Sequence, residues 1–278
     1  MLPRITTLLA LGSLSLLAAE NEEKLEWQAL PDLPGGLGVA GPFAGVHNDA
    51  LIVAGGANFP DGVPWRPLAD GSSPAKVYHD TIHVVTRDGT GHSIAEAGAK
   101  LPQALGYGVS VSTTDGVLCI GGEWRESGET HRSAKVFALG QADGEITIDE
   151  DYPPLPAATT AAAGALVGNK VYVAGGDSGQ GATKNFWLLD LAKSGTDDFE
   201  WAALPPWDGP ARTHLLASAQ HDGVNDCLYI FSGRMKEPDG PWQILSDAHK
   251  YNPRDRQWTN LHAIHPSGDA RPRSVMAG

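Results

Sequence analysis

Cysteine and positive charge are both scarce in this chain. Its 278 residues include only two cysteines, Cys119 and Cys227, and neither belongs to a CxxC pair. Both lie inside apolar, strand-like runs, so we expect buried, inert thiols rather than a metal site. Lysine and arginine number 20 against 33 acidic residues, which gives a formal net charge of −13. Nonspecific binding to nucleic acid or to an anionic membrane surface is therefore not expected.

Long apolar runs are also missing, except at the N-terminus. The largely apolar run Ile5–Leu17 follows Arg4 and precedes Ala18 and Ala19. It is too short for a transmembrane helix, which needs about 20 residues, whereas this order of features is typical of a secretory signal peptide. The sequence predicts a signal peptide over residues 1–19, a periplasmic or secreted location, and no membrane insertion after cleavage.

Histidine is present, but its spacing does not indicate a metal site. His79, His83 and His249 lie on strand-like segments and are expected to be structural. The other histidines show no HxH or HxxxH pattern, so no metal ligands are predicted.

Glycine, in contrast, is plentiful and occurs in a repeat. An apolar run ends in a glycine pair at Gly55-Gly56, Gly121-Gly122 and Gly175-Gly176, and a fourth run ends in Ser232-Gly233. The pairs recur roughly every 55 to 65 residues, and each unit also ends in a Leu-Pro-like exit. Short strands at this period, without helical periodicity, are typical of a β-propeller. The glycines allow each strand to turn at the rim of the central channel without a Cβ clash.

The repeat predicts an all-β propeller that would have six blades when complete. We expect this chain to be an open fragment, truncated at its C-terminal end, because residues 25–34 form an outer strand without a blade of their own. Four full blades are expected at about residues 38–102, 103–156, 157–206 and 207–261, followed by a partial blade at 265–278.

The glycine pairs, the later strands and the closing tryptophans resemble the kelch repeat. Within kelch proteins the chain is similar to the bacterial N-acetylneuraminate epimerase family, over most of residues 25–278. Gly38–Phe59 and the stretch from Gly106 to Glu123 look like the C-terminal half of that family, whereas His249–Pro253 with Trp258 looks like its early blades. The resemblance is therefore to a cyclically permuted branch of the family.

This resemblance implies a reaction and a pair of catalytic residues. The family interconverts the α and β anomers of N-acetylneuraminate, a sialic acid, by acid–base ring opening, which requires no cofactor. Its proposed catalytic glutamate follows a glycine, and an arginine comes later in the same loop. In this chain Glu123 and Arg132 match that pattern.

The loops after the glycine pairs supply further candidates, because propeller function usually lies in such loops. A substrate carboxylate pairs best with the planar guanidinium of arginine. The same loops also contain Asp177 and Lys184, and Tyr107 is expected to be packed. The candidate substrate-binding residues are Asn58, Arg66, Arg125 and Arg234.

Two other interpretations remain open. Glu123 could form only a loop ion pair with Arg125 or Arg132. The whole chain could also be a non-catalytic kelch module that binds glycan or protein. Anomer exchange followed by NMR, with and without the protein, distinguishes such a module from an enzyme.

Overall fold

The computed structural model describes residues 27, 29–89, 91–236, 240–261 and 263. The expected signal peptide (1–19) and partial blade (265–278) lie outside these residues. The chain divides into two compact units, Met1–Leu30 and Pro31–Gly278, and all of its described strands lie in the second.

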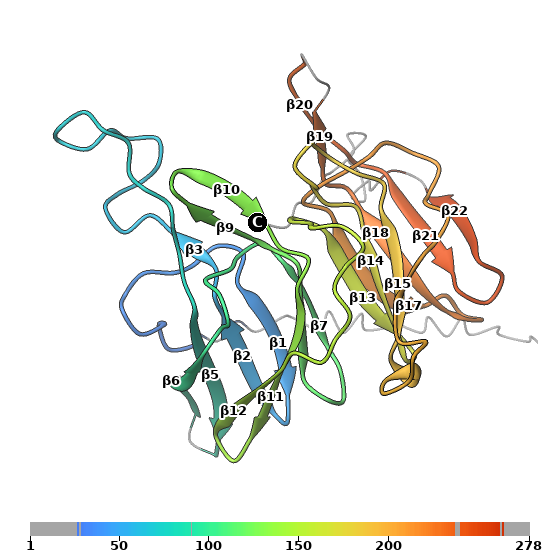
Figure 1. Ribbon diagram of the computed structural model, residues 1–278, viewed down its shortest axis with the longest axis horizontal. Helices are drawn as coiled ribbons and strands as arrows, with labels where there is room; N and C mark the ends of the chain where they lie inside the picture. The colour runs from blue at the N-terminus through green and yellow to red at the C-terminus, as the bar shows by residue number, and fades with distance from the viewer. Residues whose placement is uncertain (1–26, 28, 90, 237–239, 262, 264–278) are drawn as a thin grey trace, which may run out of the picture. The chain divides into compact units, whose positions relative to one another are not determined.

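Four antiparallel sheets of four strands form the described part of this unit (Figure 1). In each sheet the strands follow one another in chain order. The blades are β1 (Phe43–His47), β2 (Ala50–Ala54), β5 (Thr81–Asp88) and β6 (Gly91–Lys100); β7 (Val109–Ser112), β8 (Val117–Ile120), β11 (Val136–Ala142) and β12 (Glu145–Asp149); β13 (Ala163–Val167), β14 (Lys170–Ala174), β15 (Phe186–Asp190) and β16 (Trp201–Ala203); and β17 (Leu216–His221), β18 (Asp226–Phe231), β21 (Ala248–Asn252) and β22 (Gln257–Leu261).

The first strands of the blades lie side by side. β1 lies against β7, β7 against β13, and β13 against β17. The blades thus share a centre lined by their first strands, and the predicted all-β propeller with four full blades is confirmed. Helical structure in the described residues is limited to the short 3₁₀ turn Leu191–Lys193.

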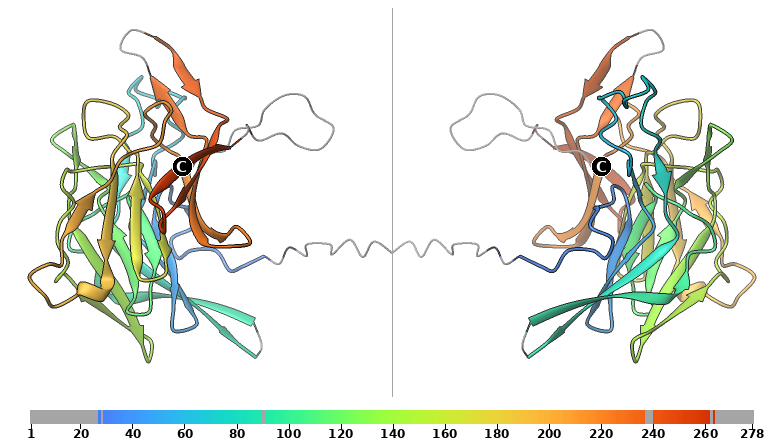
Figure 2. Two further views of the ribbon diagram at one scale, coloured as in Figure 1. Left: turned by 90° about the vertical axis from the view of Figure 1, so that its right-hand side faces the viewer. Right: turned by 90° about the vertical axis from the view of Figure 1, so that its left-hand side faces the viewer.

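Extra strands lie between the second and third strands of three blades, directly after the glycine pairs. In Figure 2, β19 and β20 project at one end of the blades and the long β5–β6 hairpin extends at the other. The extra pairs are β3 (Ala57–Asn58) with β4 (Val77–Tyr78), β9 (Glu123–Glu126) with β10 (Glu129–Arg132), and β19 (Arg234–Lys236) with β20 (Trp242–Ile244).

The glycine pairs tie each blade to the next one. Gly55 and Gly56 have φ of +67° and +87°, which is left-handed backbone that favours glycine. A Cβ on Gly55 would lie 2.3 Å from the carbonyl oxygen of Leu105, in the linker to the second blade. The N–H of Gly56 donates to that same oxygen at 2.8 Å. Gly122 and Gly176 donate in the same way to the linkers that follow them.

A chain of backbone hydrogen bonds runs around the centre, through the linker residues that precede each first strand. The N–H of Tyr107 donates to the carbonyl of Gly41 at 2.7 Å, Ala161 donates to Tyr107 at 2.7 Å, and His214 donates to Ala161 at 2.8 Å. All four have left-handed backbone, with φ between +52° and +59°. We call Gly41, Tyr107, Ala161 and His214 the central belt.

Apolar side chains fill the space between neighbouring blades. Phe43 and Ile52 of the first blade pack in one cluster with Phe137 of the second. Trp201 and Trp258 close two further wedges and donate their indole N–H to the carbonyls of Pro153 and Pro205. Large flat side chains cover much area at such positions.

A buried ion pair braces the fourth blade. The guanidinium of Arg212 is fully buried and donates to both carboxylate oxygens of Asp247, at 3.0 and 2.7 Å. Burial opposes the charge on Asp247, but hydrogen bonds from His249 and Arg212 hold the pKa of this carboxyl well below its usual value. Because both carboxylate oxygens are engaged, the charge of the buried guanidinium is compensated by Asp247.

Other expectations for the fold have mixed outcomes. Cys119 and Cys227 are buried and unpaired, which confirms their predicted burial. The predicted outer strand at residues 25–34 is wrong for the described part: Trp27 and residues 29–34 form no strand. No described strand pairs with them, and a strand needs such a partner.

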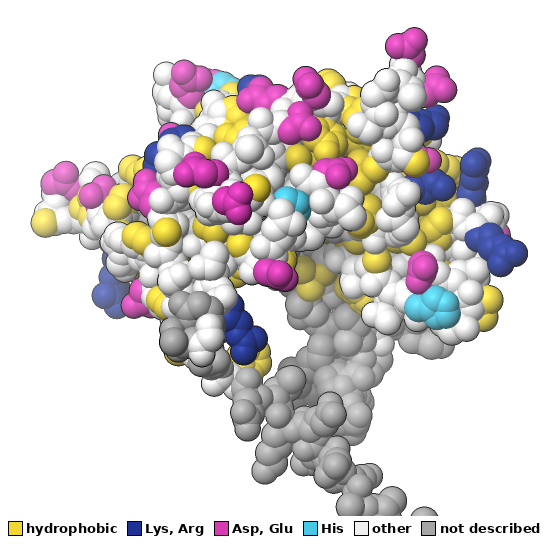
Figure 3. Space-filling view, turned by 90° about the horizontal axis from the view of Figure 1, so that it is seen from below, with side chains coloured by type: hydrophobic (Ala, Val, Ile, Leu, Met, Phe, Trp, Pro, Cys, Tyr) yellow, Lys and Arg dark blue, Asp and Glu magenta, His cyan; other side chains and the backbone are white. Residues whose placement is uncertain are grey.

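Two properties of the surface follow from the composition. Within the described ranges, no helix has the length and apolar character that crossing a membrane would require. Acidic side chains are spread over the face that is turned away from the extra hairpins (Figure 3), in keeping with the formal net charge of −13.

We predict that Ala161→Gly stabilises the protein by up to about 1 kcal/mol, since left-handed backbone costs a non-glycine residue about 1–2 kcal/mol and part of the gain is lost to the unfolded chain. Urea unfolding measures the change. Ala163→Gly is the matched control: it lies two residues later in β13 and should destabilise the protein by about 0.5–1 kcal/mol or more. Equal losses in both variants would contradict the strain assigned to the central belt.

Candidate functional site

The residue after each glycine pair occupies an equivalent place in its blade. These four residues are Ala57, Glu123, Asp177 and Arg234, and each pairs through its backbone with a linker residue beside the central belt. The fold therefore gathers one glutamate, one aspartate and one arginine around a common centre. The pairs are Ala57 with Ala40, Glu123 with Gly106, Asp177 with Thr160, and Arg234 with Thr213.

A cavity of about 320 Å³ lies among these residues. This volume is at the lower end of the range for small-molecule sites, about 300–1,000 Å³. All four blades or their linkers contribute to its wall. The lining residues are Lys76, Tyr107, Glu123, Thr160, Ala161, Asp177, Thr213, His214, Arg234 and Trp242.

The carboxylate of Glu123 is held at one of its two oxygens. Tyr78 donates its hydroxyl hydrogen to Oε1 at 2.5 Å, and Nζ of Lys76 lies 3.6 Å from the same oxygen. Lys76 also lies over the ring of Tyr107, 3.9 Å from its centre. Among the described residues nothing bonds to Oε2 of Glu123, so this oxygen is available as a proton acceptor.

Tyr78 acts as a donor at every ordinary pH. Its burial, together with the hydrogen bond to Glu123 and the charge of that residue, raises the pKa of the phenol far above its usual value. The hydroxyl therefore keeps its proton and orients the carboxylate.

Arg132 lies directly opposite Glu123 in the β9–β10 register, as expected of two residues from one loop. Its guanidinium nevertheless turns to the third blade, where Nη2 lies 3.2 Å from Oδ1 of Asp177. The predicted pair is thus brought together by the backbone, while each side chain has a different ionic partner. Asp177 also accepts a hydrogen bond from the N–H of Gly179 at 2.6 Å.

His214 and Arg234 form a third polar group in the cavity. Burial, with the nearby charge of Arg234 as the next cause, lowers the pKa of His214 to about 4. Nε2 of this neutral imidazole lies 3.1 Å from Nη2 of Arg234 and accepts a hydrogen bond from it. The Nδ1 atom then carries the hydrogen and donates to the hydroxyl of Thr213, 3.1 Å away.

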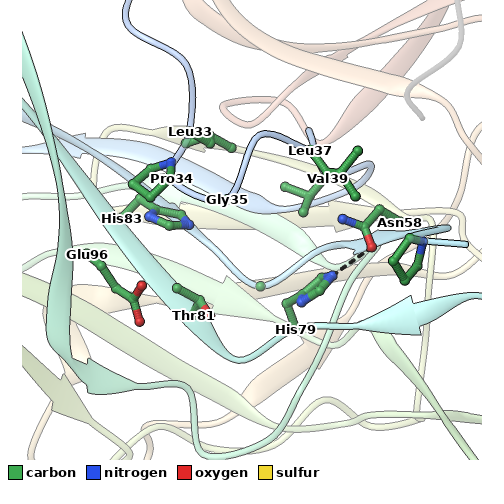
Figure 4. A pocket seen from close by; sticks show the side chains of 12 residues that line it. Leu33, Pro34, Gly35, Leu37, Val39, Asn58, His79, Thr81, His83 and Glu96 are labelled. Carbon is green, nitrogen blue, oxygen red and sulfur yellow. Dashed lines mark hydrogen bonds between the residues drawn. The ribbon is translucent and has the colours of Figure 1, made fainter.

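Three predicted substrate-binding residues lie outside this cavity. Asn58 accepts a hydrogen bond from Nε2 of His79 at 2.9 Å and lines a different pocket on the first blade, of about 220 Å³ (Figure 4). Arg66 is exposed in the loop between β3 and β4. Arg125 is also exposed, and its Nε donates to the carbonyl of Gly128 at 3.1 Å.

Several cavity residues were missed or misjudged by the sequence reasoning. Tyr107 was expected to be packed, yet it lines the cavity, as does His214. Counting back from the glycine pairs would have revealed Tyr107, which lies 14 residues before Gly121, as Gly41 and Ala161 lie 14 residues before Gly55 and Gly175. His214 lies 18 residues before Ser232, because the β17–β18 hairpin is longer, so the same count misses it. Lys76 and Trp242 lie in segments of unequal length between blades' middle strands, so no repeat signal marks them.

Comparison with known proteins identifies the family. The model of the N-acetylneuraminate epimerase family matches residues 13–148 and 152–277. The chain belongs to this family. A protein named N-acetylneuraminate epimerase from Pasteurella multocida is 39% identical over 126 residues, which is 45% of this chain and 30% of that protein. One of the same name from Yersinia pestis is 37% identical over 136 residues, 45% of this chain and 32% of that protein.

The matched stretch thus spans about 30% of the length of these curated relatives. Among solved structures, one titled "Structure of YjhT" superposes with a TM-score of 0.69, covering 91% of this chain and 77% of that chain. Its sequence is 13% identical, so this similarity supports the propeller fold and nothing finer.

The depressed pKa of His214 predicts a pH effect on stability. An imidazole with a pKa of about 4 in the folded protein and about 6.5 in the unfolded chain binds protons more readily when unfolded. Stability from this group is therefore complete above pH 6.5 and is lost as the pH falls towards 4. In urea unfolding, His214→Gln should lose less stability than the native chain over this window. A His214 ring signal that titrates above pH 6 in NMR spectra would contradict the assignment.

Proposed function

We propose that this chain interconverts the α and β anomers of N-acetylneuraminate. Two facts support the proposal: membership in the N-acetylneuraminate epimerase family, and a cavity with the ionisable groups that mutarotation needs. The observation that carries it is Glu123, whose Oε1 is held by Tyr78 and Lys76 while Oε2 has no partner in the part of the chain that the structure describes.

The reaction begins with a proton transfer to Glu123. Oε2 takes the proton of the anomeric hydroxyl, the bond between the anomeric carbon and the ring oxygen breaks, and a ketone forms. The ring oxygen, now an alkoxide, takes the proton back from the Glu123 carboxyl. Both oxygens are bonded to the same carbon of the sugar, so a single carboxyl group reaches them in turn. General acid–base catalysis of this kind contributes about 10²–10⁴-fold in rate.

The ring then closes from the other face of the ketone. Rotation about the bond to the carbonyl carbon exposes that face, and the same transfers run in reverse to give the other anomer. One C–O bond breaks and re-forms and only protons move, so the reaction needs no redox or metal cofactor.

Arg132 is the second residue of the proposed reaction. Its guanidinium is about three-quarters buried and lies between the hairpin β9–β10 and Asp177. It does not line the cavity itself, but it is ion-paired with Asp177, which does, and from that place its charge stabilises the negative charge that develops on the ring oxygen as the ring opens. The proposal assigns no substrate contact to Asn58, Arg66 or Arg125, because these residues lie outside the cavity.

Export of the chain belongs to the same proposal. Arg4, the apolar run Ile5–Leu17 and the pair Ala18-Ala19 favour a signal peptide that directs the protein to the periplasm or the medium. N-terminal sequencing of the protein from the periplasmic fraction tests this, and a product that retains Met1 would contradict it.

We predict that Glu123→Gln slows anomer exchange by about 10²-fold or more, because the amide cannot accept the proton. NMR exchange spectroscopy on freshly dissolved N-acetylneuraminate measures the rate. Glu126→Gln is the matched control, since Glu126 is exposed on the same strand and should keep the native rate. Binding of sialic acid by the native chain without any exchange would favour a non-catalytic glycan-binding module instead.

Tyr78→Phe tests the positioning of Glu123. Loss of the hydroxyl leaves Oε1 with Lys76 alone and frees the carboxylate to rotate away from the anomeric hydroxyl. We expect kcat to fall by about 10-fold, the effect of losing roughly 1.4 kcal/mol of transition-state stabilisation, with KM nearly unchanged. A rise in KM at constant kcat would assign Tyr78 to substrate binding rather than to orienting the base.

A further inference from the structure

The charges around the cavity are unequally matched. Glu123 has Lys76 as its cation, and Asp177 has Arg132. Arg234 has no carboxylate partner among the described residues. With His214 neutral, the two cations and two carboxylates that line the cavity balance each other. Arg132, the ionic partner of Asp177, adds one further positive charge beside the cavity, in a chain whose formal net charge is −13.

The guanidinium of Arg234 is held by neutral groups. Its Nη2 donates to Nε2 of His214 at 3.1 Å, and its Cζ lies 4.3 Å from the centre of the Trp242 ring. These two contacts fix the plane of the guanidinium without cancelling its charge. Its Nε is buried without a hydrogen-bond partner among the described residues, and its Nη1 donates to none of them either.

The position of His214 is itself fixed by the fold. It is the last described member of the central belt, with φ of +55°, and its N–H donates to the carbonyl of Ala161 at 2.8 Å. Its other ring nitrogen bonds to Thr213. A neutral acceptor in this place orients Arg234 and leaves its positive charge for a ligand.

The other cations described in or beside the cavity already have carboxylate partners. Lys76 lies between Glu123 and the ring of Tyr107, and Arg132 pairs with Asp177. At Lys76 or Arg132 an anionic ligand would compete with a carboxylate of the protein, whereas at Arg234 it would meet no such competitor among the described residues. Arginine also offers two parallel donors that match the two oxygens of a carboxylate.

We infer that Arg234, oriented by His214 and Trp242, binds the carboxylate of a sugar acid. This inference rests on the proposed function for the identity of the sugar. In a 2-keto sugar acid the carboxylate is attached to the anomeric carbon, so holding it at Arg234 keeps the reacting carbon in the cavity that Glu123 lines. Arg234 is then a specificity-determining residue, which selects acids over neutral sugars.

The test compares an acid with its neutral ester. N-acetylneuraminate and its methyl ester are titrated into the native full chain by calorimetry, and anomer exchange of both is followed by NMR. We expect the native chain to bind the acid at least 10-fold more tightly than the ester. Arg234→Leu should weaken binding of the acid by at least 10-fold and leave binding of the ester unchanged. Arg234→Lys should recover only part of the preference, because an ammonium lacks the planar pair of donors.

The control is Arg87→Leu, which removes one arginine from an exposed position on β5 and should change neither affinity. Circular dichroism spectra check that each variant is folded. Native affinity of Arg234→Leu for the acid, or equal affinity of the native chain for acid and ester, would overturn the inference.

The two proposals can fail separately. If the native chain binds the acid through Arg234 but catalyses no anomer exchange, the inference holds and the proposed function fails. If exchange is catalysed and Arg234→Leu has native affinity and rate, the function holds and the inference is overturned.

Discussion

The hydrogen-bonded central belt is the constraint on which the rest of the structure depends. Each of its bonds joins one blade to the next at the point nearest the centre, and each requires left-handed backbone in its residues. Only Gly41 adopts this conformation without cost, so the packing of the blades compensates the strain at Tyr107, Ala161 and His214. The apolar clusters between blades supply that compensation. Blade packing and the geometry of the cavity are therefore coupled.

The same belt explains how an acidic protein can gather one excess positive charge in and beside its cavity. Its charged residues come from positions next to the belt, where blades converge and water has little access. Side chains in the two ion pairs are between 16% and 26% exposed, so salt screens them less than it screens surface charges. Within such a site, the ion pairs that form determine which charged side chain is left without an ionic partner. Glu123 and Asp177 have partners, and Arg234 retains its charge.

The sequence predicted the parts of the fold that repeat. The glycine pairs indicated the blades, the family resemblance led to Glu123, and the loops after the pairs supplied Arg234. In the structure both residues hold equivalent backbone positions. The sequence could not predict that the side chain of Arg132 would turn to Asp177 rather than to Glu123. Strand register determines which Cα atoms lie opposite each other, but it does not determine where the end of a long side chain lies. Lys76 and Tyr78 were missed because the segment between the second and third strands differs in length from blade to blade, so the repeat does not align them with other residues. The expected strand at residues 25–34 is absent from its described part because a strand needs a pairing partner, and no described strand pairs with these residues.

The variation among the four belt residues decides what the cavity can hold. A Cβ on Gly41 would lie 2.6 Å from the ring of Tyr107, so the glycine is what permits that ring to lie across the first linker and support Lys76. Ala161 adds only a methyl group to the wall and leaves room beside Asp177. The side chains of Tyr107 and His214 are large and polar, whereas Gly41 and Ala161 add little volume at the other two belt positions. The cavity is thus divided, with Glu123 on the side of Tyr107 and Arg234 on the side of His214. A repeat fold produces this asymmetry by changing single residues at equivalent positions, while the backbone that carries them stays the same.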